Sequence, residues 1–335
     1  MDAPLSGAGP RPEFRDRRKG LAVFGVLSFA VGAFATCFTA LTPIVALAPA
    51  VAGQAAIPRA DPRGLVIATL FYAGLAALFI ALGVGSLRAR RWVRPIMLVV
   101  SWIWLGCGVL GLATWLILLP TFPSAMRATR PAEAPIPDDI MTAVTLVASL
   151  LLLAMYVALP SLFIWFYHDR DVRLTLERAD PHPRWTDRCP LPVLGLSLAL
   201  LGAGAAALAP IPYGAVPAFG GILTGASAVI FCVALAAAAL ALSRAAYRMR
   251  VWAWWGSLAL VLLVNAGSLA AFLRVDMAEV YERMHMPPED IAMMREGGLL
   301  SGSAAILTTA ALGTACLAYL VFVRKYFRER PGAAS

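Results

Sequence analysis

Several apolar runs of more than twenty residues recur along the chain, bounded by charged residues, proline or glycine. A helix needs about 20 apolar residues to cross a bilayer, and lipid offers an open backbone no hydrogen-bond partners. The runs also lack the period-two alternation of a membrane β-strand. The pattern therefore predicts eight transmembrane helices, at residues 20–48, 64–87, 92–120, 140–167, 191–210, 218–243, 250–273 and 299–323.

The amino-acid composition agrees with this pattern. Of the 335 residues, 60% are hydrophobic and 14% are charged, whereas soluble domains average about 25% charged residues. We therefore expect an all-α integral membrane protein whose main partner is the lipid bilayer.

Basic residues are distributed unevenly among the predicted connections. The two tails and the second, fourth and sixth connections hold 21 of the 28 Arg and Lys residues. Because positive charge is retained on the cytoplasmic side, we expect both termini in the cytoplasm and the protein in the cell (inner) membrane. The net charge of +9 then reflects topology and contact between cytoplasmic Arg clusters and anionic headgroups, and no nucleic-acid partner is predicted.

Four short segments recur in the same order in the two halves of the chain. For example, LAVFGVLS at 21–28 is echoed by LPVLGLSL at 191–198, and LRARRWVR at 87–94 by SRAAYRMRVW at 243–252. The separations lie between 151 and 170 residues, which indicates a duplicated four-helix unit.

An even number of helices in each copy gives both copies the same orientation, so the predicted architecture is two tandem parallel four-helix repeats. The predicted divisions are a basic cytoplasmic tail (1–19), the first repeat (20–167), a cytoplasmic linker (168–190), the second repeat (191–323) and a cytoplasmic tail (324–335).

A proline followed by two acidic residues precedes the last predicted helix of each half. Proline suits the first helical turn, and carboxylates there stabilise the positive end of the helix dipole by about 0.3–1 kcal/mol each. We interpret both motifs as structural caps at the same position of the two repeats; a paired outer binding lip is the alternative. The six residues are Pro137, Asp138, Asp139, Pro288, Glu289 and Asp290.

The second copy carries additional residues around this motif. Apolar residues at three- and four-residue spacing over 273–284 predict that the seventh helix continues out of the bilayer. A further short helix is predicted over 287–296, ending at the glycine pair 297–298. We therefore expect an outer helical cap at 273–297, which the first half lacks.

Methionine is concentrated in this predicted cap. Thioethers and an imidazole are ligands that Cu(I) and Ag(I) prefer, so the segment is a candidate metal site. The alternative is that methionine fills irregular apolar gaps, and no cofactor is predicted. The candidate ligands are Met284, His285, Met286, Met293 and Met294.

The middle of each predicted span lacks Asp, Glu, Lys, Arg and His. Proton-coupled carriers and pumps generally need such a residue at depth, so these functions are disfavoured. Asn265 is the most polar residue within a span, and Ser268 shares its helical face. We expect an interhelical hydrogen bond from Asn265, or a pathway lined by both residues if one exists.

The linker contains the segment DVRLTLERADPHPRWTDRCPLPVL at 171–194. This segment resembles a juxtamembrane segment in a group of uncharacterised bacterial multi-pass membrane proteins. The resemblance implies a multi-pass topology and no particular activity.

No sequence motif of an enzyme is present: G-x-S-x-G, H-E-x-x-H and G-x-x-x-x-G-K-[ST] are all missing. We expect a protein that is not an enzyme, and two functions remain open. One is a passive or weakly coupled carrier of small molecules or lipids, which parallel repeats favour. The other is a non-transporting membrane scaffold or envelope-associated factor that acts through its outer cap and basic inner loops.

Overall fold

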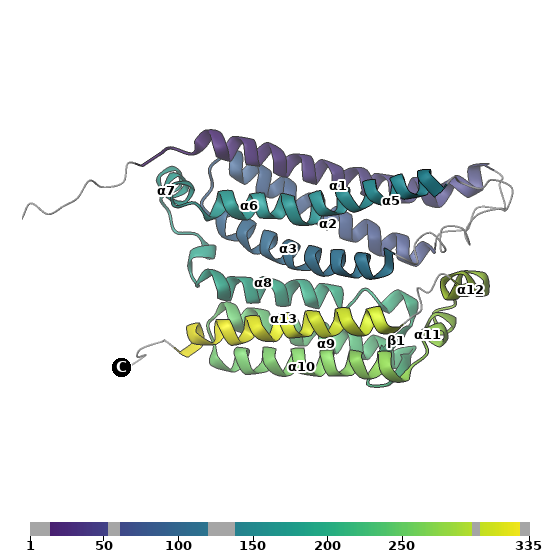
Figure 1. Cartoon of the computed structure of the whole chain (residues 1–335). Helices are drawn as coiled ribbons and strands as arrows, with labels where there is room; N and C mark the ends of the chain where they lie inside the picture. The colour runs from purple at the N-terminus through teal and green to yellow at the C-terminus, as the bar shows by residue number, and fades with distance from the viewer. Residues whose placement is uncertain (1–13, 53–60, 120–137, 297–301, 329–335) are drawn as a thin grey trace, which may run out of the picture. The chain divides into compact units, whose positions relative to one another are not determined.

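A computed structural model describes residues 14–52, 61–119, 138–296 and 302–328 (Figure 1). Within these residues, eight helical stretches are long and apolar enough to cross a membrane, which confirms the predicted class of an all-α membrane protein. The eight are α1 (Arg18–Ala52), α2 (Pro62–Leu87), α3 (Val93–Leu118), α5–η2–α6 (Asp138–Leu153, Ala154–Ala158, Leu159–His168), α8–η4 (Leu191–Ala206, Ile211–Tyr213), α9 (Ala226–Tyr247), α10 (Val251–Arg274) and α13 (Gly302–Arg328).

A short β-hairpin precedes α9, so the predicted span at 218–243 begins too early. Strands β1 (Ala215–Ala218) and β2 (Gly221–Thr224) pair antiparallel. Phe219 and Gly220 between them both have positive φ, 53° and 79°, as a two-residue hairpin turn requires. Strands of four residues are too short to show alternation, which is why the sequence pattern missed them.

The described residues form two compact units. Residues 14–52, 68–98 and 163–185 form the first, and the remaining described residues form the second. The division passes through α2, α3 and α6, and it also falls within the predicted linker, between Trp185 and Thr186. The two repeats were predicted from similar sequence segments and not from contacts, so these units do not test them and the repeats stay a prediction.

In the first unit, α1 and α2 approach closely through glycines. A Cβ added to Gly83 would lie 3.0 Å from the Gly25 carbonyl oxygen, and one on Gly32 would lie 2.8 Å from Ile80 Cγ1. Glycine is therefore required where these two backbones meet. Phe24 of α1 also stacks on an aromatic ring of α6, with ring centroids 4.0 Å apart.

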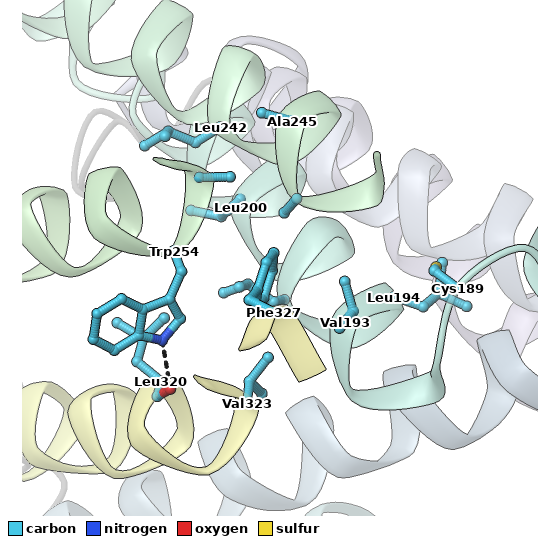
Figure 2. Packing of buried hydrophobic residues seen from close by; sticks show 13 residues of the cluster. Cys189, Val193, Leu194, Leu200, Leu242, Ala245, Trp254, Leu320, Val323 and Phe327 are labelled. Carbon is cyan, nitrogen blue, oxygen red and sulfur yellow. Dashed lines mark hydrogen bonds between the residues drawn. The ribbon is translucent and has the colours of Figure 1, made fainter. Parts of the chain in front are cut away.

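In the second unit, α8, α9, α10 and α13 lie side by side (Figure 1). Many of their buried apolar residues form a cluster near the α9–α10 turn (Figure 2). Trp254 belongs to this cluster, and its indole N–H donates a hydrogen bond of 2.8 Å to the carbonyl of Leu320. An indole buried among apolar groups thus has its polar atom satisfied.

The fourth span contains one turn of π-helix, η2. A Cβ added to Gly108 of α3 would lie 2.2 Å from the Tyr156 carbonyl oxygen within this turn. The backbone of α3 therefore approaches the fourth span closely at this π-helical turn, which only glycine allows.

The packing of α8 on α9 repeats that of α1 on α2. Gly204 faces the carbonyl of Ala236 and the side chain of Leu240, as Gly32 faces Ala76 and Ile80. The glycines are 172 positions apart and their partners 160 apart. The similar segments at 21–28 and 191–198 are 170 positions apart, so the spacing of the two contacting glycines differs from that of the sequence similarity by two residues.

The helices α2 and α9 also end in the same way. Ala89 and Met249, with φ of 48° and 58°, lie at corresponding positions 160 residues apart. In both turns this residue's N–H donates to the carbonyl three residues earlier, and the next N–H donates to the carbonyl five residues earlier. This pattern of a left-handed helix ending satisfies the last carbonyls of each helix.

Candidate functional site

The cap predicted after the seventh span is built from two short helices. Helix α10 ends at Arg274, and Asp276 starts α11 (Met277–Arg283) by accepting a hydrogen bond of 2.9 Å from the Ala278 N–H. The predicted continuous extension over 273–284 is therefore wrong, because this N-cap begins a new helix. The predicted short helix is confirmed as α12 (Pro288–Glu296), and residues 276–296 are called the α11–α12 cap.

A tight link joins α11 to α12. His285 has a φ of 62°, and its N–H and that of Met286 donate to carbonyls of the last turn of α11. The guanidinium of Arg63, at the start of α2, donates to the carbonyl of Met284 (3.3 Å). These bonds fix the path of the link between the two short helices.

The α11–α12 cap carries an open cavity of about 380 Å³, most of whose lining residues are exposed. Ile291 is 6% exposed and contributes an apolar side chain to the wall of the cavity. Glu282 and Arg295 contribute opposite charges, and neither pairs with the other or with any other described residue. The lining consists of Glu282, Met286, Pro288, Ile291, Ala292 and Arg295.

The two acidic motifs occupy different positions. Asp138 begins α5, which continues through the fourth span, and Asp139 is exposed there. Pro288 begins α12, which ends before α13 starts. The expectation that both motifs open the fourth span of their repeat therefore fails for the second motif, because extra residues separate it from the span. Pro137 and the side chains of Asp138, Glu289 and Asp290 lie outside what the structure describes.

The candidate copper ligands are only partly brought together. Met286 lines the cavity, His285 is exposed, and Met284 and Met294 are half-buried, while the side chain of Met293 lies outside the described set. The described residues contain no group of three or more His, Cys, Asp or Glu that could hold a metal. A thioether site for Cu(I) stays a prediction.

Asn265 joins two spans of the second unit. Its side-chain N–H donates to the Thr309 carbonyl of α13 (3.0 Å). A Cβ on Gly313 would lie only 1.9 Å from the Asn265 amide nitrogen, so α13 presents glycine where the amide packs. Ser268, one turn further along α10, is half-buried. The arrangement matches the interhelical hydrogen bond that we expected.

Other polar side chains within the second unit's spans also connect helices. Ser197 and Ser243 each donate to the other's carbonyl, at 3.0 and 2.7 Å. The Tyr319 hydroxyl donates to the Pro192 carbonyl (2.7 Å). Two further contacts are Thr114 with Thr308 (2.8 Å) and the Trp115 indole with Ser149 (2.9 Å).

A polar cluster in the first unit was not predicted from the sequence. Helix α7 (Arg170–Ala179) starts with Asp169 as N-cap and buries Val172 on its inner face. Arg17 binds this helix twice: its guanidinium lies 2.9 Å from Asp169, and its backbone N–H donates to Thr175 (3.1 Å). The segment before α1 is thereby attached to the helix that follows the fourth span.

Asp180 follows the last residue of α7 and is 5% exposed. Arg184 donates to both of its carboxylate oxygens, at 3.1 and 3.0 Å. These hydrogen bonds, with smaller contributions from Arg91 and Arg90, hold the pKa of Asp180 below its ordinary value despite the opposing effect of burial.

Tyr167 is fully buried next to the α2–α3 turn. Its hydroxyl is hydrogen-bonded to Ser86, and its carbonyl accepts a hydrogen bond of 3.0 Å from Arg94. The residues 160 positions later than Tyr167 and Ser86 are Phe327 and Ala246, both buried in the second unit. At this spacing, the polar pair of the first unit corresponds to an apolar pair of the second.

Comparison with protein-family models, with curated proteins and with solved structures finds no match to this chain. Its sites are therefore interpreted from their residues and geometry.

Proposed function

We propose that this protein is a non-transporting scaffold of the cell (inner) membrane, and not an enzyme. It consists of two tandem parallel repeats with both termini in the cytoplasm, and it acts through the α11–α12 cap on the outer side and basic turns on the inner side.

The hydrogen bonding of Asn265 carries this proposal. A polar pathway needs side chains that are free to bind water or a solute, whereas Asn265 donates to the backbone of α13 and packs against Gly313. The serine pair between α8 and α9 is likewise occupied in mutual hydrogen bonds. In lipid, such bonds hold helices together, each contributing about 0.5–2 kcal/mol.

Two observations support the duplication. The α1–α2 and α8–α9 contacts use corresponding residues, and the α2 and α9 endings share one backbone geometry at a spacing of 160. Left-handed helix endings and glycine contacts are each common in membrane helices, so the support comes from the spacing of 160 residues that the two turns and the glycine partners share.

The charge distribution supports the orientation and the lipid contact. Arg88 and Arg248 occupy the same position in the two turns, both are exposed, and neither forms an ion pair with a described residue. Guanidinium groups at such turns suit anionic headgroups of the cytoplasmic leaflet, each worth about 1 kcal/mol.

Labelling with a membrane-impermeant, charged thiol reagent tests the proposal without knowledge of a substrate. The five native cysteines are replaced by alanine, and Asn265→Cys or Ser268→Cys is introduced in the full chain. Arg248→Cys, at an exposed turn, gives the rate for a water-accessible position. Ala246→Cys, at a fully buried position, gives the rate for a dry one.

We expect positions 265 and 268 to react as slowly as position 246. Reaction at the rate of position 248, in variants that remain monodisperse, would show water at this depth. That result would reject the scaffold and favour the carrier of small molecules or lipids.

A further inference from the structure

The cavity of the α11–α12 cap presents two opposite charges that are available to a ligand. Glu282 and Arg295 line the same space, and the described residues offer neither of them an ion-pair partner. By contrast, Glu279 and Arg283 on the same short helix neutralise each other at 2.6 Å. A bound molecule that satisfies both cavity charges must carry a cation and an anion of its own.

The remaining lining residues restrict the cation. Met286, Pro288, Ile291 and Ala292 are apolar, and none of the six lining residues is aromatic. Quaternary ammonium groups are held by aromatic rings. A primary ammonium instead donates hydrogen bonds, which the Glu282 carboxylate accepts.

The position of the cavity restricts the source of the ligand. Helix α10 ends at Arg274, and α11 starts three residues later at Met277. The headgroup layer on each face of a bilayer is about 5–8 Å thick, because the core measures about 30 Å and the whole bilayer about 40–45 Å. A cavity just beyond the end of a spanning helix therefore lies at headgroup depth.

We propose that this cavity binds a phosphoethanolamine group, with its ammonium at Glu282 and its phosphate at Arg295, carried by a phospholipid of the adjoining leaflet. The apolar residues then contact the glycerol and the first acyl carbons. The assignment to a lipid rests on the proposed placement of the cap at the membrane surface.

Native mass spectrometry of the full-length protein tests the assignment. The protein is reconstituted with equal amounts of phosphatidylethanolamine, phosphatidylcholine and phosphatidylglycerol, released into detergent, and the retained lipids are counted. Glu282→Gln and Arg295→Gln are compared with a double variant, Glu279→Gln/Arg283→Gln. The double variant removes a charge pair from α11 outside the cavity and keeps the net charge unchanged.

We expect the wild-type protein to retain phosphatidylethanolamine in preference to the other two lipids. Each cavity variant should lower this retention about tenfold, as expected for loss of a charged hydrogen bond, and the control variant should leave it unchanged. Equal retention of the ethanolamine and choline lipids, or equal losses in the control and cavity variants, would overturn the proposal.

The phosphoethanolamine group could come from a membrane phospholipid or from a soluble molecule. Measuring the thermal stability of the same proteins with soluble O-phosphoethanolamine distinguishes these two sources. Stabilisation that depends on Glu282 and Arg295, without retained lipid, would keep the ligand chemistry and reject the lipid. Fast thiol labelling at position 265 would reject the scaffold function but would not affect the lipid-binding result, because the α10–α13 contact and the cavity share no residue.

Discussion

The α2–α3 and α9–α10 turns share one backbone but stabilise it with different chemistry. Beneath the first turn, Ser86 is hydrogen-bonded to the hydroxyl of Tyr167. Beneath the second, the corresponding Ala246 and Phe327 belong to an apolar cluster. The same position can therefore be filled by a satisfied polar pair or by a pair without polar atoms, since neither leaves a buried donor or acceptor unpaired.

The sizes of two neighbouring side chains also differ between the two turns. Val93 packs where a side chain on Gly85 would stand, because a Cβ there would lie 2.3 Å from Val93 Cγ2. The corresponding residues of the second turn are Ala245 and Ala253, both buried. A glycine with a valine has three side-chain carbons and an alanine with an alanine has two, so the two turns divide nearly the same side-chain volume differently between the paired positions.

The largest loss of stability is expected when Gly85 alone is changed to alanine, the residue at the corresponding position of the second turn, while Val93 is kept. Gly85→Ala should destabilise the protein by about 1–3 kcal/mol, because the new methyl overlaps the fully buried Val93. Gly85→Ala/Val93→Ala recreates the second turn's combination and should recover most of this loss. Chemical unfolding in detergent measures both, with Ala245→Gly as a control costing about 0.5–1 kcal/mol. Failure of the double variant to recover stability would contradict the comparison.

A somewhat smaller effect is expected from the polar pair. Ser86→Ala should cost about 1–2 kcal/mol, because it leaves the buried Tyr167 hydroxyl without a partner. Ser86→Ala/Tyr167→Phe converts the pair to the chemistry of the second turn and should lose less than the sum of the two single variants. A double-mutant cycle measures this coupling, and strict additivity would show that the two side chains do not act together.

The exposed arginines should behave alike in the two turns. Arg88→Gln and Arg248→Gln should each weaken stabilisation by anionic lipid by about 1 kcal/mol, and high salt should remove the effect. Lipid titration of thermal stability at low and high salt measures it, with Arg283→Gln in the α11–α12 cap as the control. A clear difference between the two turns would argue against their equivalence on the same face of the membrane.

The smallest effect is expected from pH, and it concerns Asp180 of the first unit. Because the pKa of Asp180 is lowered in the folded protein, its contribution to stability is present above the ordinary value of 3.8 and is lost as the pH falls through the folded pKa. Asp180→Asn should therefore flatten the decline in thermal stability between about pH 5 and about pH 2. Arg184 is 38% exposed, so solvent screening limits the size of this effect. An unchanged decline would show that other carboxylates cause it.

Part of the fold and of the candidate sites could be predicted from single residues and their spacing. The contact of Asn265 with a neighbouring helix followed from one amide in an apolar span, and α12 followed from a proline and a glycine pair. The break between α10 and α11 was missed, because apolar spacing continues through Asp276 although that residue caps a new helix. The β-hairpin was missed because its four-residue strands are too short to show alternation, and because Phe219 adopts a left-handed conformation that is uncommon for its residue type.

The sequence by itself determined that the chain crosses a membrane about eight times, since long apolar runs have no other stable conformation in lipid. It also indicated which short segments resemble one another in the two halves, because such similarity is visible in the order of residues, and the duplication stays a prediction. Only the tertiary structure decided that Ser86 meets Tyr167, that Val93 fills the space beside Gly85, and that Glu282 and Arg295 line one cavity. These pairings depend on how helices rotate and approach one another, which packing sets and residue order alone does not specify.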